Sequence, residues 1–201
     1  MLRKIMLALS LLISAPAYAA DIVALSASSE DNKPVRLLHV YHYDLYPRLR
    51  LAGNNNVDFD TDANWSRIQI KPRLQIELYE HNGLSFKVTD QVEYFNVRDR
   101  VERTSNRLGA GVVWKYKSFS AEVNYYAIDS GDETTRWDSY LNYRVGKWGF
   151  NNQLWYVPET DKRYEQFTVS YKVYKNWAVQ AQQQYLTGLE DVTRIGIRVR
   201  F

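Results

Sequence analysis

Basic side chains recur at every second position in several stretches of this 201-residue sequence, and they suggest anion binding. In the segment 192–201, an extended strand would place basic residues on one face and apolar residues on the other. The basic residues are Arg194, Arg198 and Arg200, and the apolar ones are Ile195, Ile197, Val199 and Phe201. Arginine binds carboxylates through paired hydrogen bonds. Such a strand predicts a polar lumen on one side and lipid on the other.

The same basic face continues through the earlier strand-like segments. It collects these cations: Arg67, Lys71, Arg73, Lys87, Arg107, Lys115, Arg136, Arg144, Lys172, Arg194, Arg198 and Arg200. Its acidic residues are Glu77, Glu93, Glu122 and Asp138. All of the cations except Lys115 are our candidate anion-binding residues. Two interpretations stay open: an anion-selective lumen, or a barrel interior filled by arginine and glutamate side chains that hold it rigid.

Hydrophobic alternation defines the elements that would carry these residues. Strands are predicted at 35–51, 65–80, 84–97, 107–117, 119–128, 135–145, 148–158, 163–174, 177–186 and 192–201. The first has the poorest alternation, and 52–64 is expected to be a loop. We predict an all-β chain that folds as a transmembrane antiparallel up-and-down β-barrel of about ten strands.

The connections and the aromatic residues support this topology. Short turns, such as His81-Asn82-Gly83, alternate with longer polar loops, as in outer-membrane barrels with short periplasmic turns. Trp114, Trp148 and Trp177 fall beside short turns, and other aromatic residues fall toward the longer loops, which predicts two interfacial girdles. A soluble barrel of the lipocalin type, with the apolar face inside, is the structural alternative.

The N-terminal residues indicate export. Arg3 and Lys4 precede an apolar run, and Ala17-Tyr18-Ala19 resembles a cleavage site, so 1–19 is predicted to be a signal peptide. Residues 20–34 are expected to form a periplasmic lead-in and 35–201 the barrel. The absence of cysteine excludes disulfides and thiolate metal sites. The formal net charge of +3 includes Arg3 and Lys4, so net charge indicates no particular partner and no nucleic acid.

The predicted outer loops are acidic. Asp58, Asp60 and Asp62 have the spacing of the first ligands of a calcium loop, but Ala63 and Gln69 replace its glycine and its final glutamate. We therefore expect a solvated loop and no resident metal. Loose bridging of lipopolysaccharide phosphates by divalent cations is the functional alternative. Phe59 is the only aromatic residue of this loop that could dock a protein partner.

The sequence gives little support for catalysis. His39 and His42 would point to opposite faces of a strand, and His81 would lie in a turn. No serine-centred motif accompanies any of them, so we expect neither an enzyme nor a cofactor. A neutral polar wall is predicted on the later strands, either as a sugar-binding surface or as hydrogen-bonded filler: Asn124, Asn142, Asn151, Gln153, Gln166, Gln180, Gln182 and Gln184.

A signal peptide, an arginine-lined lumen and the terminal strand Arg194-Ile195-Gly196-Ile197-Arg198-Val199-Arg200-Phe201 resemble the small monomeric outer-membrane porins for acidic oligosaccharides, the oligogalacturonate and sialic-acid porin family. The resemblance implies uptake of anionic sugars, and because that family has twelve strands, twelve are possible here. We expect a narrow channel in the cell outer membrane for small anionic solutes, with both termini in the periplasm. Other expected partners are membrane lipid, lipopolysaccharide and, through the last strand, the barrel assembly machinery. A non-conducting structural or partner-binding barrel is the alternative.

Overall fold

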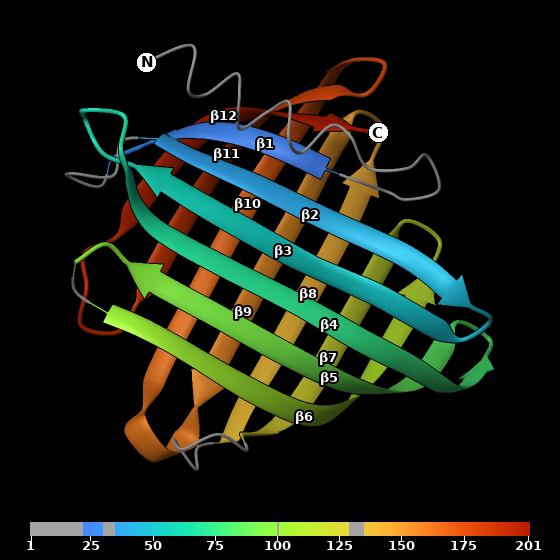
Figure 1. Cartoon of the computed structure of the whole chain (residues 1–201). Coiled ribbons are helices and arrows are strands. Elements are labelled where there is room, and N and C mark those ends of the chain that lie inside the picture. Colours follow the sequence, from blue (N-terminus) through green and yellow to red (C-terminus); the bar gives the residue numbers. More distant parts are fainter. Residues whose placement is uncertain (1–21, 30–34, 100, 129–134) are drawn as a thin grey trace.

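The computed structural model describes residues 22–29, 35–99, 101–128 and 135–201, which form a closed antiparallel β-barrel (Figure 1). Its strands are β1 (Ile22–Ser28), β2 (Val35–Tyr46), β3 (Leu49–Phe59), β4 (Trp65–His81), β5 (Leu84–Val97), β6 (Val101–Tyr116), β7 (Phe119–Ile128), β8 (Thr135–Val145), β9 (Trp148–Val157), β10 (Lys162–Tyr174), β11 (Trp177–Leu186) and β12 (Val192–Arg200). A single turn of 3₁₀-helix, η1 (Pro158–Thr160), precedes β10. Consecutive strands pair, and β1 pairs with β12 to close the barrel. The predicted all-β up-and-down architecture is confirmed, with twelve strands in the described residues.

The N-terminal part of the barrel corrects three predictions. The expected lead-in at 20–34 contains β1, the expected single strand at 35–51 spans β2 and the start of β3, and the expected loop at 52–64 is strand as far as Phe59. Asn54, Asn55 and Asn56 resemble a loop in the sequence, yet ladder hydrogen bonds to β2 and β4 hold them in the barrel wall. The predicted signal peptide at 1–19 lies outside the described residues.

The two ends of the barrel differ in their connections. At one end, two-residue turns join β2 to β3, β4 to β5, β6 to β7, β8 to β9 and β10 to β11. Each turn contains a residue with positive φ, such as Gly83 at 80° or Lys175 at 40°. We call this the turn end, and the opposite end, with its longer connections, the loop end. β1 begins and β12 ends at the turn end, because Ile22 pairs with Arg200.

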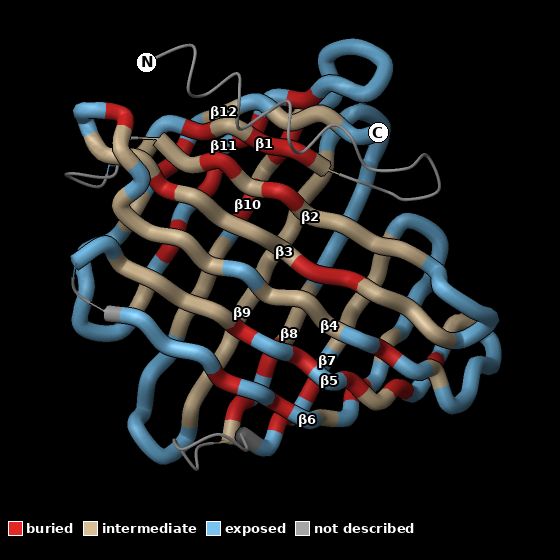
Figure 2. Tube along the Cα trace, in the orientation of Figure 1, coloured by how far each residue is buried: buried red, intermediate tan, exposed pale blue. Residues whose placement is uncertain are grey.

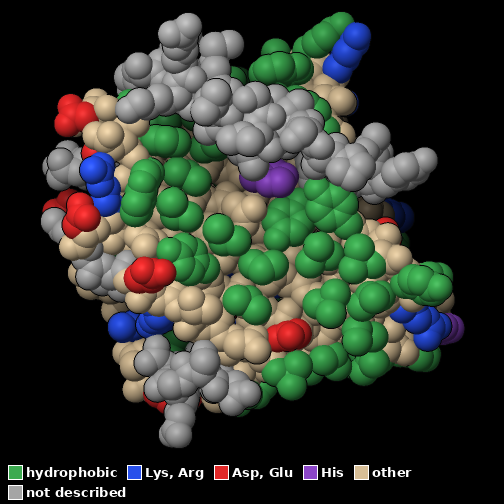
Figure 3. All heavy atoms as spheres, in the orientation of Figure 1, with side chains coloured by type: hydrophobic (Ala, Val, Ile, Leu, Met, Phe, Trp, Pro, Cys, Tyr) green, Lys and Arg blue, Asp and Glu red, His purple; other side chains and the backbone are tan. Residues whose placement is uncertain are grey.

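Side chains alternate between a lumen face and an outer face along every strand. On β5 and β11 this produces alternating buried and exposed residues, visible as short red segments along the tube (Figure 2). The outer face is largely hydrophobic (Figure 3). Exposed aromatic residues on it include Trp114, Trp148 and Trp177 near the turn end and Tyr125 and Trp137 toward the loop end. Among the described residues, no helix is long and apolar enough to cross a membrane.

Candidate functional site: the lumen

The strand register places all eleven candidate anion-binding residues on the lumen face. They are Arg67, Lys71, Arg73, Lys87, Arg107, Arg136, Arg144, Lys172, Arg194, Arg198 and Arg200. Directly opposite residues of an antiparallel ladder point to the same side of the sheet, so the lumen face can be traced from strand to strand around the barrel. The structure does not bring them together in one site. Some join ion pairs toward the loop end, whereas others lie at the turn end without an acidic partner among the residues that the structure describes.

An ion-paired group crosses the lumen in its loop-end half. Glu93 accepts from Lys71 at 3.0 Å and from Arg107 at 2.7 Å, and Arg136 lies 3.8 Å from it. Arg136 also donates to Asp138 at 2.7 Å. These five residues, which we call the paired layer, come from β4, β5, β6 and β8 and are almost fully shielded from solvent, with Asp138 only 1% exposed. Strong mutual charge neutralisation is what permits so many ionised groups to be buried together.

Aromatic side chains fill the space around the paired layer. The Arg136 guanidinium lies 5.1 Å from the ring centroid of Trp155, which stacks on Tyr164 with centroids 5.6 Å apart. Tyr126 is 0% exposed. Its ring fits there because Gly109, directly opposite on β6, has no side chain: a Cβ at Gly109 would lie 2.5 Å from the Tyr126 ring. Charged and aromatic side chains therefore fill much of the loop-end half of the lumen.

A second acidic centre lies at the loop end. Asp58 is 1% exposed and accepts hydrogen bonds from Arg36 at 2.6 and 3.0 Å and from Arg67 Nε at 2.6 Å. Asp60 accepts instead from the backbone N–H groups of Asp62 and Asn64, so the three aspartates of the calcium-like spacing do not converge. Asp58 serves as a lumen counter-ion, and the loop that follows is held by its own Asp60 turn.

The candidate Lys87 has a carboxylate partner closer to the turn end. It forms an ion pair with Glu122, which also accepts from Asn124 at 2.8 Å. Arg73 lies over the ring of Tyr140 at 5.8 Å from its centroid. These contacts lie on the wall formed by β4 to β8, so positive charge on that side is largely balanced or covered by aromatic rings.

The opposite wall at the turn end carries uncompensated arginines. Arg198 donates to the Ser170 hydroxyl at 3.0 Å, and its charged neighbours are Arg144 and Arg200. In the part of the chain that the structure describes, none of the three forms an ion pair with an acidic side chain. Arg144 and Arg200 are exposed. We call these three residues the arginine wall, and Lys172 lies exposed on the same side of the opening.

Small lumen-facing residues give the arginine wall its room. Gly149 is directly opposite both Arg144 and Ser170, and a Cβ built on Gly149 would lie 3.9 Å from the Arg198 guanidinium. Gly196 also faces the lumen, two residues before Arg198, but it allows the close approach of β1, because a Cβ there would clash with the Leu25 carbonyl oxygen. The arginines thus project over a surface with few side chains, which leaves their N–H groups available to a soluble anion.

Most of the amide side chains predicted to form a neutral polar wall bond to other lumen side chains. Gln184 donates to Gln166 at 2.6 Å, Gln182 donates to Thr168 at 3.2 Å, and Asn151 donates to Asn142 at 2.7 Å. Arg194 also donates to Gln184. Gln180, Gln182 and Gln184 are each less than 9% exposed. Of the two interpretations, the hydrogen-bonded filler fits Gln182 and Gln184, which are bonded and buried, whereas Asn142 is exposed.

The histidines occupy three separate places. His39 lies on the outer face between Val23 and Asn55, whereas His42 faces the lumen opposite Ala52, so the prediction of opposite faces is confirmed. His81 lies beside the β4–β5 turn, where its ring nitrogen is 3.0 Å from Asn82. None has a serine directly opposite it in the ladder.

Several residues that shape the lumen were missed from the sequence. Arg36 and Asp58 belong to β2 and β3, where polar residues interrupt the alternation, and no motif in the sequence marks Trp155 and Tyr164 as lumen residues. For Arg36 and Asp58, the signal that could have revealed their lumen position is the two-residue turn at Pro47–Arg48. Splitting 35–51 at that turn gives two hairpin strands whose register places Arg36 opposite Asp58.

Comparison with solved structures gives the same fold. The outer membrane phospholipase A of Escherichia coli matches with a TM-score of 0.69 and 14% identity, over 96% of each chain. The KdgM porin in complex with disordered oligogalacturonate matches with a TM-score of 0.62 and 11% identity, over 91% of this chain and 99% of the porin. The NanC porin matches with a TM-score of 0.62 and 13% identity, over 90% of this chain and 100% of the porin.

No protein-family model and no curated protein matches the sequence. At these identities the likeness shows a shared fold: the chain is a twelve-stranded barrel of the kind found in outer-membrane proteins, similar both to porins and to a phospholipase. The expected resemblance to the oligogalacturonate and sialic-acid porins is confirmed at the level of structure.

Proposed function

We propose that this protein is a porin-like barrel of the outer membrane that admits small anionic solutes, such as acidic sugars, through a basic lumen. The arginine wall carries this proposal, because three guanidinium groups lie at the turn end of the lumen without an acidic partner among the described residues. Uncompensated cations in a low-dielectric channel raise the local concentration of anions. The structural likeness to a porin in complex with oligogalacturonate supports the same class of solute.

In this proposal the turn end faces the periplasm, as the short turns of outer-membrane barrels do. Both ends of the mature chain are then periplasmic, after removal of a signal peptide at 1–19. The candidate anion-binding residues divide into two roles. Arg144, Arg198 and Arg200, with Lys172, bind the solute at the periplasmic opening, whereas cations such as Lys71, Arg107 and Arg136 form a constriction with Glu93.

The protein acts, in our proposal, without catalysis, although one similar barrel is a phospholipase. A serine hydrolase needs a serine hydroxyl within hydrogen-bond reach of a histidine. The residues directly opposite His39 are Val23 and Asn55, and the residue opposite His42 is Ala52. Neither Ala52 nor Leu84, which lies directly opposite His81, carries a hydroxyl that could act as the nucleophile.

The paired layer favours a second function, that of a non-conducting structural or partner-binding barrel. Glu93, Arg107, Arg136 and Asp138 are all less than 10% exposed, so the layer leaves little room for a solute at that depth. The two functions differ in one property: a channel must open the layer under an ion gradient, and a scaffold keeps it closed.

Single-channel recording in a planar bilayer tests the proposal. Under a salt gradient the folded protein should conduct, and the sign of its reversal potential should be that of a channel more permeable to anions than to cations. Changing Arg144, Arg198 and Arg200 together to Gln should lower the anion-to-cation permeability ratio by about threefold or more, because the fixed positive charge at the opening is removed. Lys117→Gln, in an exposed turn outside the lumen, is the matched control and should leave the ratio unchanged.

Two results would contradict the channel. Silence from correctly folded, inserted protein would favour the non-conducting barrel. If the anion-to-cation permeability ratio is the same in the triple variant and the parent, the three arginines do not determine selectivity. Heat-modifiable migration on a gel separates either result from a failure to fold.

A further inference from the structure

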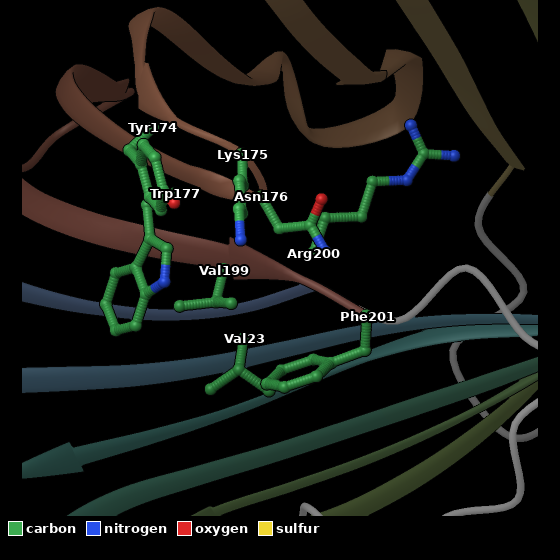
Figure 4. A pocket seen from close by; sticks show the side chains of 8 residues that line it. All are labelled: Val23, Tyr174, Lys175, Asn176, Trp177, Val199, Arg200 and Phe201. Carbon is green, nitrogen blue, oxygen red and sulfur yellow. The ribbon is translucent and has the colours of Figure 1, made fainter.

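A groove crosses the outer wall of the barrel at the turn end, where β12 meets β1 (Figure 4). Its volume is about 460 Å³. The floor consists of Val23 and Val199, which lie directly opposite each other in the β1–β12 ladder. Trp177 and Phe201 form its sides, and Tyr174 and Lys175 of the β10–β11 turn lie at one end. We call this feature the seam groove.

The strand register explains why the wall is hollow here. Trp177, Val199 and Val23 form one row of outward-facing residues across β11, β12 and β1. Two short branched side chains therefore lie between a large indole on one side and the Phe201 ring on the other. The floor and sides offer hydrocarbon contact, so the matching occupant is a hydrocarbon chain.

The polar end of the seam groove is cationic. Lys175 is an exposed turn residue, and its Nζ lies 5.2 Å from the ring centroid of Tyr174. The Arg200 guanidinium extends away from Val23 and Phe201, so Lys175 is the cation of this groove (Figure 4). No aspartate or glutamate is among the described residues that line it. Tryptophan and tyrosine beside a lysine are typical of the level at which lipid headgroups meet the hydrocarbon core.

We propose that the seam groove binds one glycerophospholipid of the leaflet that surrounds the turn end. One acyl chain lies along Val23 and Val199 between Trp177 and Phe201, and the phosphate accepts a hydrogen bond from the Lys175 ammonium group. Charge complementarity selects this occupant, because an apolar slot that ends at a lysine with no carboxylate partner among the described residues matches a hydrocarbon chain that ends at a phosphate.

Two other turns provide internal controls. Lys117 lies 5.1 Å from the ring centroid of Tyr116, and Lys147 lies 5.9 Å from that of Tyr171. Both lysines therefore share the aromatic neighbour and the turn position of Lys175, but neither lines the seam groove. A lipid held by the groove depends on Lys175 and Val199, whereas lipid held by general surface charge depends equally on all three lysines.

Native mass spectrometry of the folded protein in detergent micelles tests the proposal. Separate samples receive phosphatidylglycerol, a diacylglycerol with the same acyl chains, or inorganic phosphate. We expect one retained phosphatidylglycerol and no comparable retention of the other two. Lys175→Gln should lower the retained fraction about fivefold, the effect of one lysine at a membrane surface. Val199→Trp, which fills the floor and leaves the charge unchanged, should also lower it, and Lys117→Gln should not.

Each opposite result would overturn the proposal. If diacylglycerol is retained as well as phosphatidylglycerol, the phosphate contact plays no part in binding. If inorganic phosphate binds as well as phosphatidylglycerol, the apolar groove plays no part. An equal loss in Lys117→Gln and Lys175→Gln would mean diffuse charge binding. Because the variants lie on the outer wall, the bilayer currents that test the proposed channel should not change, and the two proposals therefore fail independently.

Discussion

The paired layer and the arginine wall use the same kind of side chain in the lumen of one barrel, with opposite results. In the paired layer, Glu93 lies within ion-pair distance of Lys71, Arg107 and Arg136, and almost no solvent reaches the group. On the arginine wall, the contact found for Arg198 is a serine hydroxyl, and its charged neighbours are two more arginines. Acidic partners, rather than the number of cations, distinguish the two regions.

This difference separates stability from binding. A buried cation must be neutralised and hydrogen-bonded by the protein itself, which leaves it little capacity for a ligand. An exposed arginine keeps its five N–H donors for a passing anion, at the cost of repulsion from its neighbours. We therefore expect changes in the paired layer to alter mainly the free energy of unfolding, and changes in the arginine wall to alter mainly anion selectivity.

The largest expected effect comes from removing the carboxylate at the centre of the paired layer. Glu93→Gln keeps the size of the side chain but leaves Lys71 and Arg107 buried without their counter-ion. The free energy of unfolding should fall by about 3–5 kcal/mol, as it does when one partner of a buried ion pair is lost. Urea unfolding in lipid vesicles, followed by tryptophan fluorescence, measures the change.

Glu77→Gln is the matched control for Glu93. Glu77 also faces the lumen, from β4, but has no ion pair within the described residues. Its replacement should change stability by no more than about 0.5 kcal/mol, as is usual away from a specific contact. Similar losses in the two variants would show that total lumen charge, and not the geometry around Glu93, determines stability.

A smaller effect should distinguish the packing of the two regions. A Cβ at Gly109 would lie 2.5 Å from both the Tyr125 carbonyl oxygen and the Tyr126 ring, so Gly109→Ala forces buried groups apart. We expect a loss of about 1–3 kcal/mol, as for other overpacked cores. At Gly149, beside the arginine wall, the nearest atom at 2.8 Å is the Ser170 hydroxyl, which can rotate away.

Gly149→Ala should therefore cost clearly less than Gly109→Ala in the same unfolding assay. If the two substitutions cost the same, the lumen would be equally full at both places, and the open surface that we assign to the arginine wall would be wrong. Circular dichroism of each variant before unfolding shows whether the barrel has formed.

The sequence was sufficient for the number and order of the strands from β4 to β12, because alternation there is regular and the chain folds into consecutive hairpins. One boundary was wrong: β6 begins at Val101, six residues before the predicted start at 107, because 101–106 pair with β5. A residue such as Arg136 could be assigned to the lumen from its parity within the strand alone. Near the N-terminus, the Asn54-Asn55-Asn56 run breaks the alternation, and β1 is only seven residues long. There the pairing with β12 and β4 decides the structure, and such long-range pairing leaves no local pattern.

The alternation of residues between the two faces of a strand also could not separate the paired layer from the arginine wall. Arg136 and Arg144 lie on the same face of β8, eight residues apart, and the sequence treats them alike. Their environments differ because Glu93 reaches Arg136 from a different strand, and which strands face each other across a lumen depends on the stagger of the closed barrel. Candidate lumen cations could be predicted from sequence, but their partners could not.

The smallest predicted effect concerns repulsion within the arginine wall. Changing Arg144, Arg198 and Arg200 together to Gln removes three like charges, so at low salt the free energy of unfolding should rise, by less than about 1 kcal/mol, because two of the three groups are exposed. Near 1 M salt the difference should disappear, because the Debye length falls to about 3 Å. Urea midpoints at the two salt concentrations test this. A variant that is less stable than the parent at both concentrations would show that the arginines support the barrel through packing, and the division between a stabilising layer and a binding wall would then fail.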